Sequence, residues 1–374
     1  MSGPTSSGTK STTNPQFLIA LLGKRDMPTD GVEDYCTFLS LALGQRGMQM
    51  ELARVEWFDR GWVPALWMLW RQSAAWSGRW VLVQYTGLSW SRRGFPIGVL
   101  AALSILRRRG CRCAIVFHEF RHQGGGARRI DRMRGACQQW VIEKLYRGSM
   151  KSIFTVPLGK VGWLPQGDER SAFIPIGANL PERLERRSGP GAPGRQKTVI
   201  VFGVTGDARA AGEVEEIADV MKEASKSLAS LRLVLTGRGS MEVRKEIEAA
   251  LAGNGVEVVV RGVLPAEEVA DEFARADVLL FVRGAITLQR GSAIAGIACG
   301  LPIVGYRVGG NGDALDEAGI EWSPWRDRRR LAQGLVRVLS DSARWTELRE
   351  RNLQAQRDHF SWMRIAEQYG ATLD

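Results

Sequence analysis

The sequence predicts an α/β protein with two doubly wound parallel sheets. Short apolar runs rich in Val, Ile and Leu alternate with longer stretches of helical periodicity, which is typical of parallel strands joined by crossover helices. This alternation stops at residues 178–197, where Pro, Gly and Arg accumulate, and then restarts. At 374 residues the chain is also long for a single core. We therefore expect two domains, with ligands bound beyond the carboxyl ends of the strands in an interdomain cleft.

The first domain is predicted at residues 16–180. Residues 1–15 are rich in Ser, Thr, Gly and Pro and lack an apolar core, so they are predicted to be a disordered tail. Helices are expected at residues 32–46 and 127–146. The strand-like runs are residues 17–22, 48–55, 80–85, 113–117 and 153–156.

The second domain is predicted at residues 198–355, after a linker at residues 181–197. The C-terminal residues 356–374 are predicted to form a further helix. Within the domain, helices are expected to begin near Glu213, Met241, Ala266 and Ser292, and the strand-like runs are residues 198–202, 231–236, 256–260, 278–282 and 302–305.

Composition favours a globular protein without a membrane span. Hydrophobic residues make up 44% of the chain and charged residues 24%. The longest candidate span, residues 95–106, is shorter than the roughly 18 residues that a bilayer requires. The cysteines form an odd set without a CxxC pair, which indicates reduced thiols rather than disulfides or zinc, and we expect a cytoplasmic protein. They are Cys36, Cys111, Cys113, Cys137 and Cys299.

Basic residues and tryptophans gather between residues 57 and 151. From Arg92 to Lys151 the chain has fourteen Arg and Lys residues against three acidic ones, which accounts for the whole formal net charge of +11. Such a zone suits nucleic acid, anionic lipid headgroups or a phosphorylated substrate, or it is a solvated helix face. Seven of the thirteen tryptophans lie between residues 57 and 90. Several are expected in the core, but Trp67 and Trp70 are predicted to form one apolar stripe with Leu66 and Leu69, and Trp with Arg is typical of a membrane interface.

Residues 281–306, FVRGAITLQRGSAIAGIACGLPIVGY, run from a Gly-rich loop into a helix of small residues and then a strand. A helix that opens at residues 289–292 would offer free backbone N–H groups to an anion, with the charge of Arg290 beside them. Ala293, Ala295 and Gly296 are small enough for close packing on a sheet. The alternative is an ordinary crossover that ends at Gly300.

Six segments in the same order resemble glycosyltransferase group 1, the retaining, nucleotide-sugar-dependent enzymes with two facing Rossmann-like domains, the B-type fold, and most closely its family 4. The segments are GVEDYCTFLSLALGQRG at residues 31–47, VFHEF at 116–120, FIPIGANLP at 173–181, RGVLPAEEVADEFARADVLLF at 261–281, the segment just described with its ACGLPIV, and FSWMRIAEQY at 360–369. The resemblance implies transfer of a sugar from a nucleoside diphosphate to a glycan, lipid-linked or small-molecule acceptor. It also implies that the C-terminal helix packs back on the first domain.

The resemblance implies roles for particular residues. His118 would contact the transferred sugar or orient the acceptor as a catalytic residue, with Glu119 beside it. The base would lie near Arg261 and Val263, and cationic side chains would stabilise the departing diphosphate. The complete predicted donor-binding set is Gly31, Gly203, Arg238, Arg261, Val263, Arg283, Arg290, Gly291 and Ser292.

The chain also departs from the family pattern. Where many members carry two glutamates, it has Thr287 and Ala295, and the loop after the first strand of the second domain has only Arg209 in place of an Arg and Lys pair. A subgroup with an Arg-Gly-Ser turn looks closer, with Arg290 and Ser292 at the phosphates. No DxD element or metal-ligand spacing is present, so neither a metal nor another cofactor is predicted.

Three alternatives remain at this stage. The protein could be a catalytically silent nucleotide-sugar or glycan-binding protein, because the paired glutamates are missing, or a nucleotide-sugar epimerase of the same shape. Nucleic-acid binding ranks last, because no recognition module is present, and we predict no nucleic-acid partner. A dehydrogenase is disfavoured because the Gly-rich turn GRGSME at residues 237–242 lacks the third glycine of a dinucleotide fingerprint. The Trp- and Arg-rich residues 57–151 suggest peripheral contact with an anionic membrane at its cytoplasmic face.

Overall fold

A computed structural model describes residues 17–120, 129–181, 189, 195–205, 210–309 and 314–374. The predicted tail at residues 1–15 and most of the predicted linker, residues 182–188 and 190–194, lie outside these described residues. By its internal contacts the chain divides into two compact units. Unit 1 consists of residues 1–28 and 39–152, and unit 2 of residues 29–38 and 153–374.

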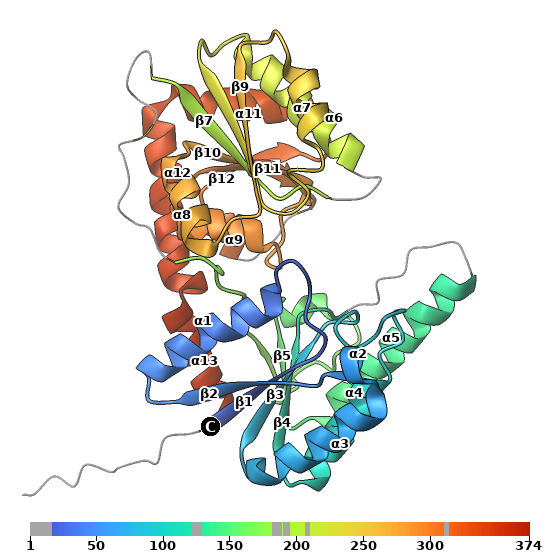
Figure 1. The fold of residues 1–374 in the computed structure, drawn as a ribbon. Coiled ribbons are helices and arrows are strands. Elements are labelled where there is room, and N and C mark those ends of the chain that lie inside the picture. Colours follow the sequence, from blue (N-terminus) through green and yellow to red (C-terminus); the bar gives the residue numbers. More distant parts are fainter. Residues whose placement is uncertain (1–16, 121–128, 182–188, 190–194, 206–209, 310–313) are drawn as a thin grey trace, which may run out of the picture. The chain divides into compact units, whose positions relative to one another are not determined.

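The first sheet has six strands in the order β2-β1-β3-β4-β5-β6 (Figure 1). β1 pairs in parallel with β2 and β3, and β3 with β4. The predicted runs at residues 17–22 and 80–85 are confirmed residue for residue, whereas β6 was not predicted because it has only three residues. The strands are β1 (Phe17–Leu22), β2 (Gln49–Arg54), β3 (Trp80–Tyr85), β4 (Arg112–Phe117), β5 (Lys151–Phe154) and β6 (Ser171–Phe173).

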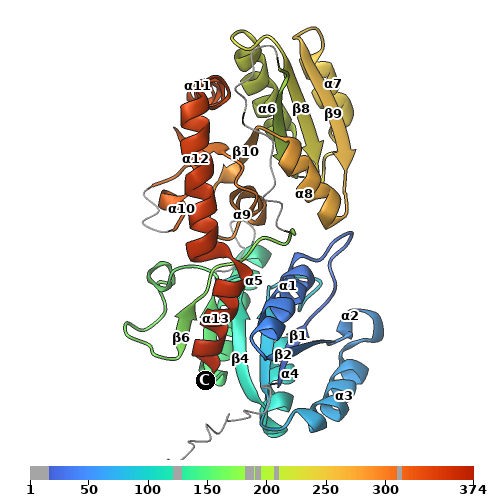
Figure 2. The ribbon, with the colours of Figure 1, turned by 90° about the vertical axis from the view of Figure 1, so that its left-hand side faces the viewer.

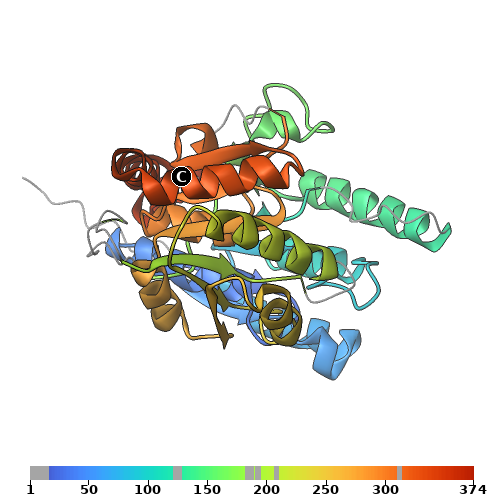
Figure 3. The same cartoon turned by 90° about the horizontal axis from the view of Figure 1, so that it is seen from above.

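Helices cover both faces of this sheet. The connection from β1 to β2 runs in one direction along the sheet, and the later connections run in the opposite direction. Because such crossovers are right-handed, α1 lies on one face of the sheet and α3, α4 and α5 lie on the other (Figures 1 and 2). Seen from above, the start of α5 extends away from the sheet (Figure 3). The helices are α1 (Gly31–Gln45), α2 (Trp57–Arg60), α3 (Trp62–Gln72), α4 (Gly98–Arg108) and α5 (Arg129–Gly148).

The predicted apolar stripe on α3 is wrong. Leu69 is buried at 2% exposure, whereas Trp67 and Trp70 are 57% and 39% exposed. The four residues were grouped because all are apolar. On a helix, however, residues 67 and 70 form one stripe and residues 66 and 69 another, about 100° away around the helix axis. Only Leu69 and its neighbour Ala65 face the core.

The second sheet has the order β12-β11-β10-β7-β8-β9, and all five of its strand pairs are parallel. The predicted run at residues 231–236 is confirmed residue for residue, and β12 was not predicted. The strands are β7 (Lys197–Phe202), β8 (Leu231–Thr236), β9 (Val256–Gly262), β10 (Val278–Ala285), β11 (Ile303–Arg307) and β12 (Ile320–Pro324).

Alternate residues of each central strand feed two separate cores. In β10, Val278 and Leu280 pack into the core on one face, and Leu279 and Phe281 into the core on the other. This double burial explains why the strands read as continuous apolar runs. The covering helices are α6 (Ala210–Ser225), α7 (Arg244–Leu251), α8 (Ala266–Arg275), α9 (Gly291–Ala298), α10 (Ala314–Glu317) and α11 (Arg328–Ser340).

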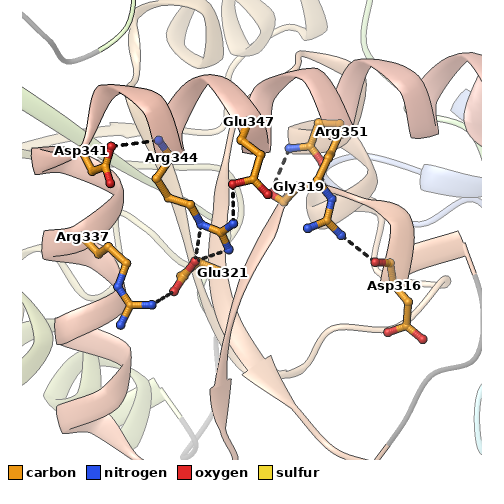
Figure 4. Close-up of polar contacts among 9 residues, drawn as sticks. Asp316, Gly319, Glu321, Arg337, Asp341, Arg344, Glu347 and Arg351 are labelled. Atoms are coloured by element: carbon orange, nitrogen blue, oxygen red, sulfur yellow. Dashed lines mark hydrogen bonds and ion pairs between the residues drawn. The ribbon is translucent and has the colours of Figure 1, made fainter.

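Two further helices complete unit 2, α12 (Ser342–Ala355) and α13 (Trp362–Leu373). Glu321 of β12 is 7% exposed in its side chain and accepts from Arg337 of α11 at 2.8 Å and from Arg344 of α12 at 2.8 Å (Figure 4). One buried carboxylate therefore fixes both helices to the sheet edge. In α13, the Tyr369 hydroxyl hydrogen-bonds the Tyr35 hydroxyl of α1 at 2.8 Å, so the last helix packs against the first part of α1.

Candidate functional site

The second sheet reverses its strand order between β7 and β10, and this is where α/β sheets bind ligands. Gly203 follows β7 with a φ of +78°, in the left-handed region that favours glycine. A Cβ there would lie 2.8 Å from Nη1 of Arg283. The guanidinium of Arg283, a β10 residue, therefore lies next to the end of β7.

Arg283 and Arg290 converge at this point. The register of β10 against β11 shifts between Phe281 and Ala285, which interrupts the ladder at Arg283. Desolvation by burial lowers the pKa of Arg290, and the positive charge of Arg283 lowers it further. The Nε of Arg283 is buried and has no hydrogen-bond acceptor among the described residues. Two guanidinium groups therefore lie close together, and the Nε–H group of Arg283 has no acceptor among the described residues.

A single carboxylate offsets these charges in part. Glu213, in the first turn of α6, raises the pKa of Arg290 and so opposes the effect of Arg283. Its own oxygens accept hydrogen bonds from the backbone N–H of Thr205, at 2.8 Å, and from the Thr205 hydroxyl. Two guanidiniums against one carboxylate leave a net positive charge, which suits an anion.

The start of α9 adds backbone donors beside Arg290. Arg290 is the N-cap residue, and no side chain caps the helix. The N–H groups of Gly291 and Ser292 have no acceptor among the described residues, as expected for the first positions of a helix. The close packing predicted for α9 is confirmed, since a Cβ on Gly296 would lie 2.8 Å from Leu279 in the sheet.

An aromatic side chain flanks the same place. Trp325, just after β12, is 44% exposed and makes an edge contact with Tyr306 at a centroid distance of 5.6 Å. Its Cη2 lies 3.9 Å from where a Cβ of Gly284 would stand, and Nη2 of Arg290 lies 3.6 Å from that point. Trp325 was missed in the sequence because it follows a strand that was itself missed.

The remaining predicted donor residues have other partners. Arg238 donates to the backbone oxygen and, at 2.9 Å, to the hydroxyl of Thr29. Its backbone oxygen accepts from Val204 at 2.8 Å, so only its main chain adjoins Gly203. Arg261 forms an ion pair with Glu272 at 3.4 Å.

The surroundings of Gly31 and Val263 differ from those of Gly203 and Arg290. Gly31 opens α1, and its oxygen accepts from Asn179 at 2.9 Å. The Asp30 carboxylate accepts from the N–H groups of Val32 and Glu33, at 3.0 and 3.2 Å, and so occupies two backbone donors of this helix start. Val263 is 46% exposed at the end of β9. The structure therefore gathers Gly203, Arg283, Arg290, Gly291 and Ser292 at one place, and gives Arg238, Arg261 and Gly31 other contacts.

His118 and Glu119 follow β4 in unit 1, as predicted. His118 Nε2 lies 2.8 Å from Oε1 of Gln84, a β3 residue that is 1% exposed. An amide oxygen only accepts, so the Nε2–H group of His118 donates to Gln84. Gln84 was missed, although a glutamine inside the apolar run WVLVQY is a visible signal.

Glu119 has a mixed environment. Burial raises the pKa of its carboxyl, while the hydrogen bond from the Gly87 N–H, at 2.7 Å, works in the opposite direction. It therefore holds a proton at higher pH than an exposed glutamate does.

The described residues contain no group of three His, Cys, Asp or Glu side chains placed to hold a metal ion. All five cysteines are free thiols, as predicted. Among the helices of the described residues, none has the length and apolar character to cross a membrane.

The chain is similar to known proteins, in sequence over part of its length and in fold over most of it. Residues 196–341 match the family model of glycosyl transferases group 1. No curated protein sequence matches the chain. Among solved structures, the fold is similar to sucrose-phosphate synthase from Thermosynechococcus elongatus, with 17% identity, a TM-score of 0.65, and coverage of 96% of this chain and 98% of that one.

Two further structures share the fold. HepE from Anabaena, solved with UDP and glucose, has 13% identity and a TM-score of 0.65, covering 96% of this chain and 99% of that one. A Listeria monocytogenes protein assigned as a UDP-N-acetylglucosamine 2-epimerase has 12% identity and a TM-score of 0.62, covering 96% of each chain. The chain has the two-domain fold of the B-type glycosyltransferases, and its residues 196–341 match the family model of glycosyl transferases group 1.

Proposed function

We propose that the protein transfers a sugar from a nucleoside diphosphate, with the diphosphate held between Arg283, Arg290 and the start of α9. The observation that carries this proposal is the convergence of Arg283 and Arg290 at Gly203 and Gly284, with the buried Nε of Arg283 lacking an acceptor among the described residues. Like charges repel, so such a pair is stabilised when an anion lies between them.

The same arrangement favours the reaction. When the sugar leaves, the nucleoside diphosphate gains negative charge, and cations that are already in place stabilise that charge without reorganising. The donor is a substrate, and we propose that neither a metal nor another cofactor takes part. We also propose that the anomeric configuration is retained, as the family resemblance implies, without a carboxylate nucleophile.

His118 and Glu119 are proposed to act on the sugar or the acceptor. Gln84 holds the His118 ring through the hydrogen bond to Nε2, which orients the imidazole for contact with a hydroxyl group. The acceptor class is proposed to be a glycan, a lipid-linked intermediate or a small hydroxyl compound. HepE is similar in fold and was solved with UDP and glucose, which supports a nucleotide sugar as donor.

Thermal shift measurements with a graded series of ligands test the site. We expect a nucleoside to give no shift, the monophosphate a small one and the diphosphate the largest, because each phosphate adds charge between the two arginines. Equal shifts for nucleoside and diphosphate would contradict the proposal. The series is run with uridine, guanosine and adenosine compounds, so that the base is identified in the same experiment.

Product analysis then separates the remaining activities. The similarity to the Listeria monocytogenes protein favours an epimerase as the second candidate. An epimerase changes the sugar of the nucleotide without any acceptor, whereas a transferase needs one. A silent binding protein would give the diphosphate-dependent thermal shift with no product in either assay.

A further inference from the structure

The outer side of α3 carries an exposed aromatic stripe. Val63, Trp67 and Trp70 are 81%, 57% and 39% exposed, and their spacing of four and three residues places them on one side of the helix. Core contacts do not account for these side chains, because Ala65 and Leu69 on the other side already make them.

Arginines border this stripe. The Arg71 guanidinium lies 4.8 Å from the Trp67 ring centre, and that of Arg109 lies 3.6 Å from the Trp70 ring centre. Arg109 also donates to the Trp70 backbone oxygen at 2.9 Å. Neither α3 nor α4 contains an acidic residue.

α5 repeats the pattern on a second helix. Ile130, Met133 and Trp140 are 45%, 62% and 47% exposed and share one side, and Lys144 lies 5.9 Å from the Trp140 ring centre. The two acidic residues of the helix are each paired with an arginine in the next turn. The pairs are Asp131 with Arg134 at 2.9 Å and Glu143 with Arg147 at 3.4 Å.

Both helices lie on the same face of the first sheet, with α4 packed against each of them (Figure 1). The helix on the other face, α1, has acidic residues in its first turn and no basic residue in its last. Six exposed apolar side chains of unit 1 and several of its arginines therefore lie in the layer formed by α3, α4 and α5, whereas other exposed apolar side chains, such as Leu41 of α1, lie elsewhere.

We propose that the layer of α3, α4 and α5 docks on a bilayer that contains anionic lipids. Trp67, Trp70, Met133 and Trp140 enter the boundary between headgroups and acyl chains, and the arginines contact the lipid phosphates. Nucleic acid would use the arginines but would leave Met133 and Val63 in water. A bilayer is the one charged surface that takes up both kinds of side chain.

Vesicle flotation of the full chain tests the proposal. We expect the protein to float with vesicles of phosphatidylglycerol and phosphatidylcholine in low salt, and to stay behind with phosphatidylcholine alone. Each arginine near the surface contributes about fivefold in binding, so added salt should release the protein.

Matched glutamate substitutions locate the surface. Met133→Glu in α5 and Trp67→Glu in α3 should each lower the bound fraction by at least tenfold, because a carboxylate would meet lipid phosphates. Leu41→Glu in α1 is the control, since Leu41 is 63% exposed and Met133 62%. If a glutamate variant loses its circular dichroism spectrum, Met133→Gln and Trp67→Gln replace it.

Several outcomes would overturn the proposal. These are a wild-type protein that does not float, glutamate variants that float like wild type, or an equal loss for Leu41→Glu. A wild-type protein that retards RNA on a gel but does not bind vesicles would assign the surface to nucleic acid instead. Donor thermal shifts are measured on the same variants, so a failure of the docking surface is distinguished from a failure of the donor site.

Discussion

The carboxyl edges of the two sheets have related topology but opposite electrostatics. At the second sheet, two guanidiniums converge next to Gly203, and burial together with the charge of Arg283 lowers the pKa of Arg290. At the first sheet, His118 is held by a neutral amide and Glu119 has its pKa raised by burial. The first arrangement suits a fixed anion, and the second suits hydroxyl groups and protons. Strand order therefore decides where a site forms, and a few side chains decide its chemistry.

Removal of the paired cations should break this contrast at the step of donor binding. Arg283→Gln and Arg290→Gln should each weaken binding of a nucleoside diphosphate by about thirtyfold or more, because a charge-assisted hydrogen bond contributes about 2 kcal/mol. Isothermal titration calorimetry measures the Kd. Arg244→Gln is the matched control, because Arg244 is an exposed α7 residue paired with Glu248.

The stability of the same two variants in the absence of ligand provides a control. In the absence of ligand the two arginines repel each other, so each single variant should be at least as stable as wild type. A variant that is clearly less stable would show that the arginines brace the fold, and the loss of binding would then have another cause.

At the first sheet, His118→Ala should lower kcat by about a hundredfold and leave the Kd for the donor nucleotide unchanged. Gln84→Leu should lower kcat by a smaller factor, about tenfold, because the ring remains but its tautomer is no longer fixed. Steady-state kinetics with donor and acceptor varied separately gives these values. A pH profile that is unchanged in Gln84→Leu would contradict the positioning role.

Gly203→Ala tests the close approach of the two strands. The left-handed φ and the 2.8 Å contact with Arg283 should together lower the free energy of unfolding by about 2 kcal/mol. Urea denaturation measures this. Gly253→Ala, also at a positive φ but with no atom within 4 Å of the added Cβ, separates backbone strain from the clash. Equal losses in both variants would mean that Arg283 does not press on Gly203.

The smallest expected effect is a pH dependence at Glu119. A carboxyl whose pKa is raised in the folded state binds its proton more tightly there than in the unfolded chain, so the folded state loses stability as pH rises above the usual glutamate range and through the raised pKa. Glu119→Gln keeps an acceptor for Gly87 and removes the titration. Its melting temperature should match wild type in acid and exceed it at neutral pH.

The sequence predicted most of the strands because those buried on both faces are continuous apolar runs. β12 was missed because Glu321 and the terminal Pro324 interrupt its pattern, and the far end of β10 was missed because Arg283 and Gly284 do. Arg290 was found from local sequence. Its convergence with Arg283 over Gly203 depends on the pairing of β7 with β10, which no local pattern reveals.

The burial of Ala295 limits how this chain can change. Its side chain is 2% exposed, in the core between α9 and the sheet. A glutamate introduced there would have to bury its charge or force the helix away from Leu279 and Ile303, which already contact Gly296 closely. A substitution of Ala295 by glutamate would therefore not restore the paired-glutamate pattern without displacing α9 from the sheet.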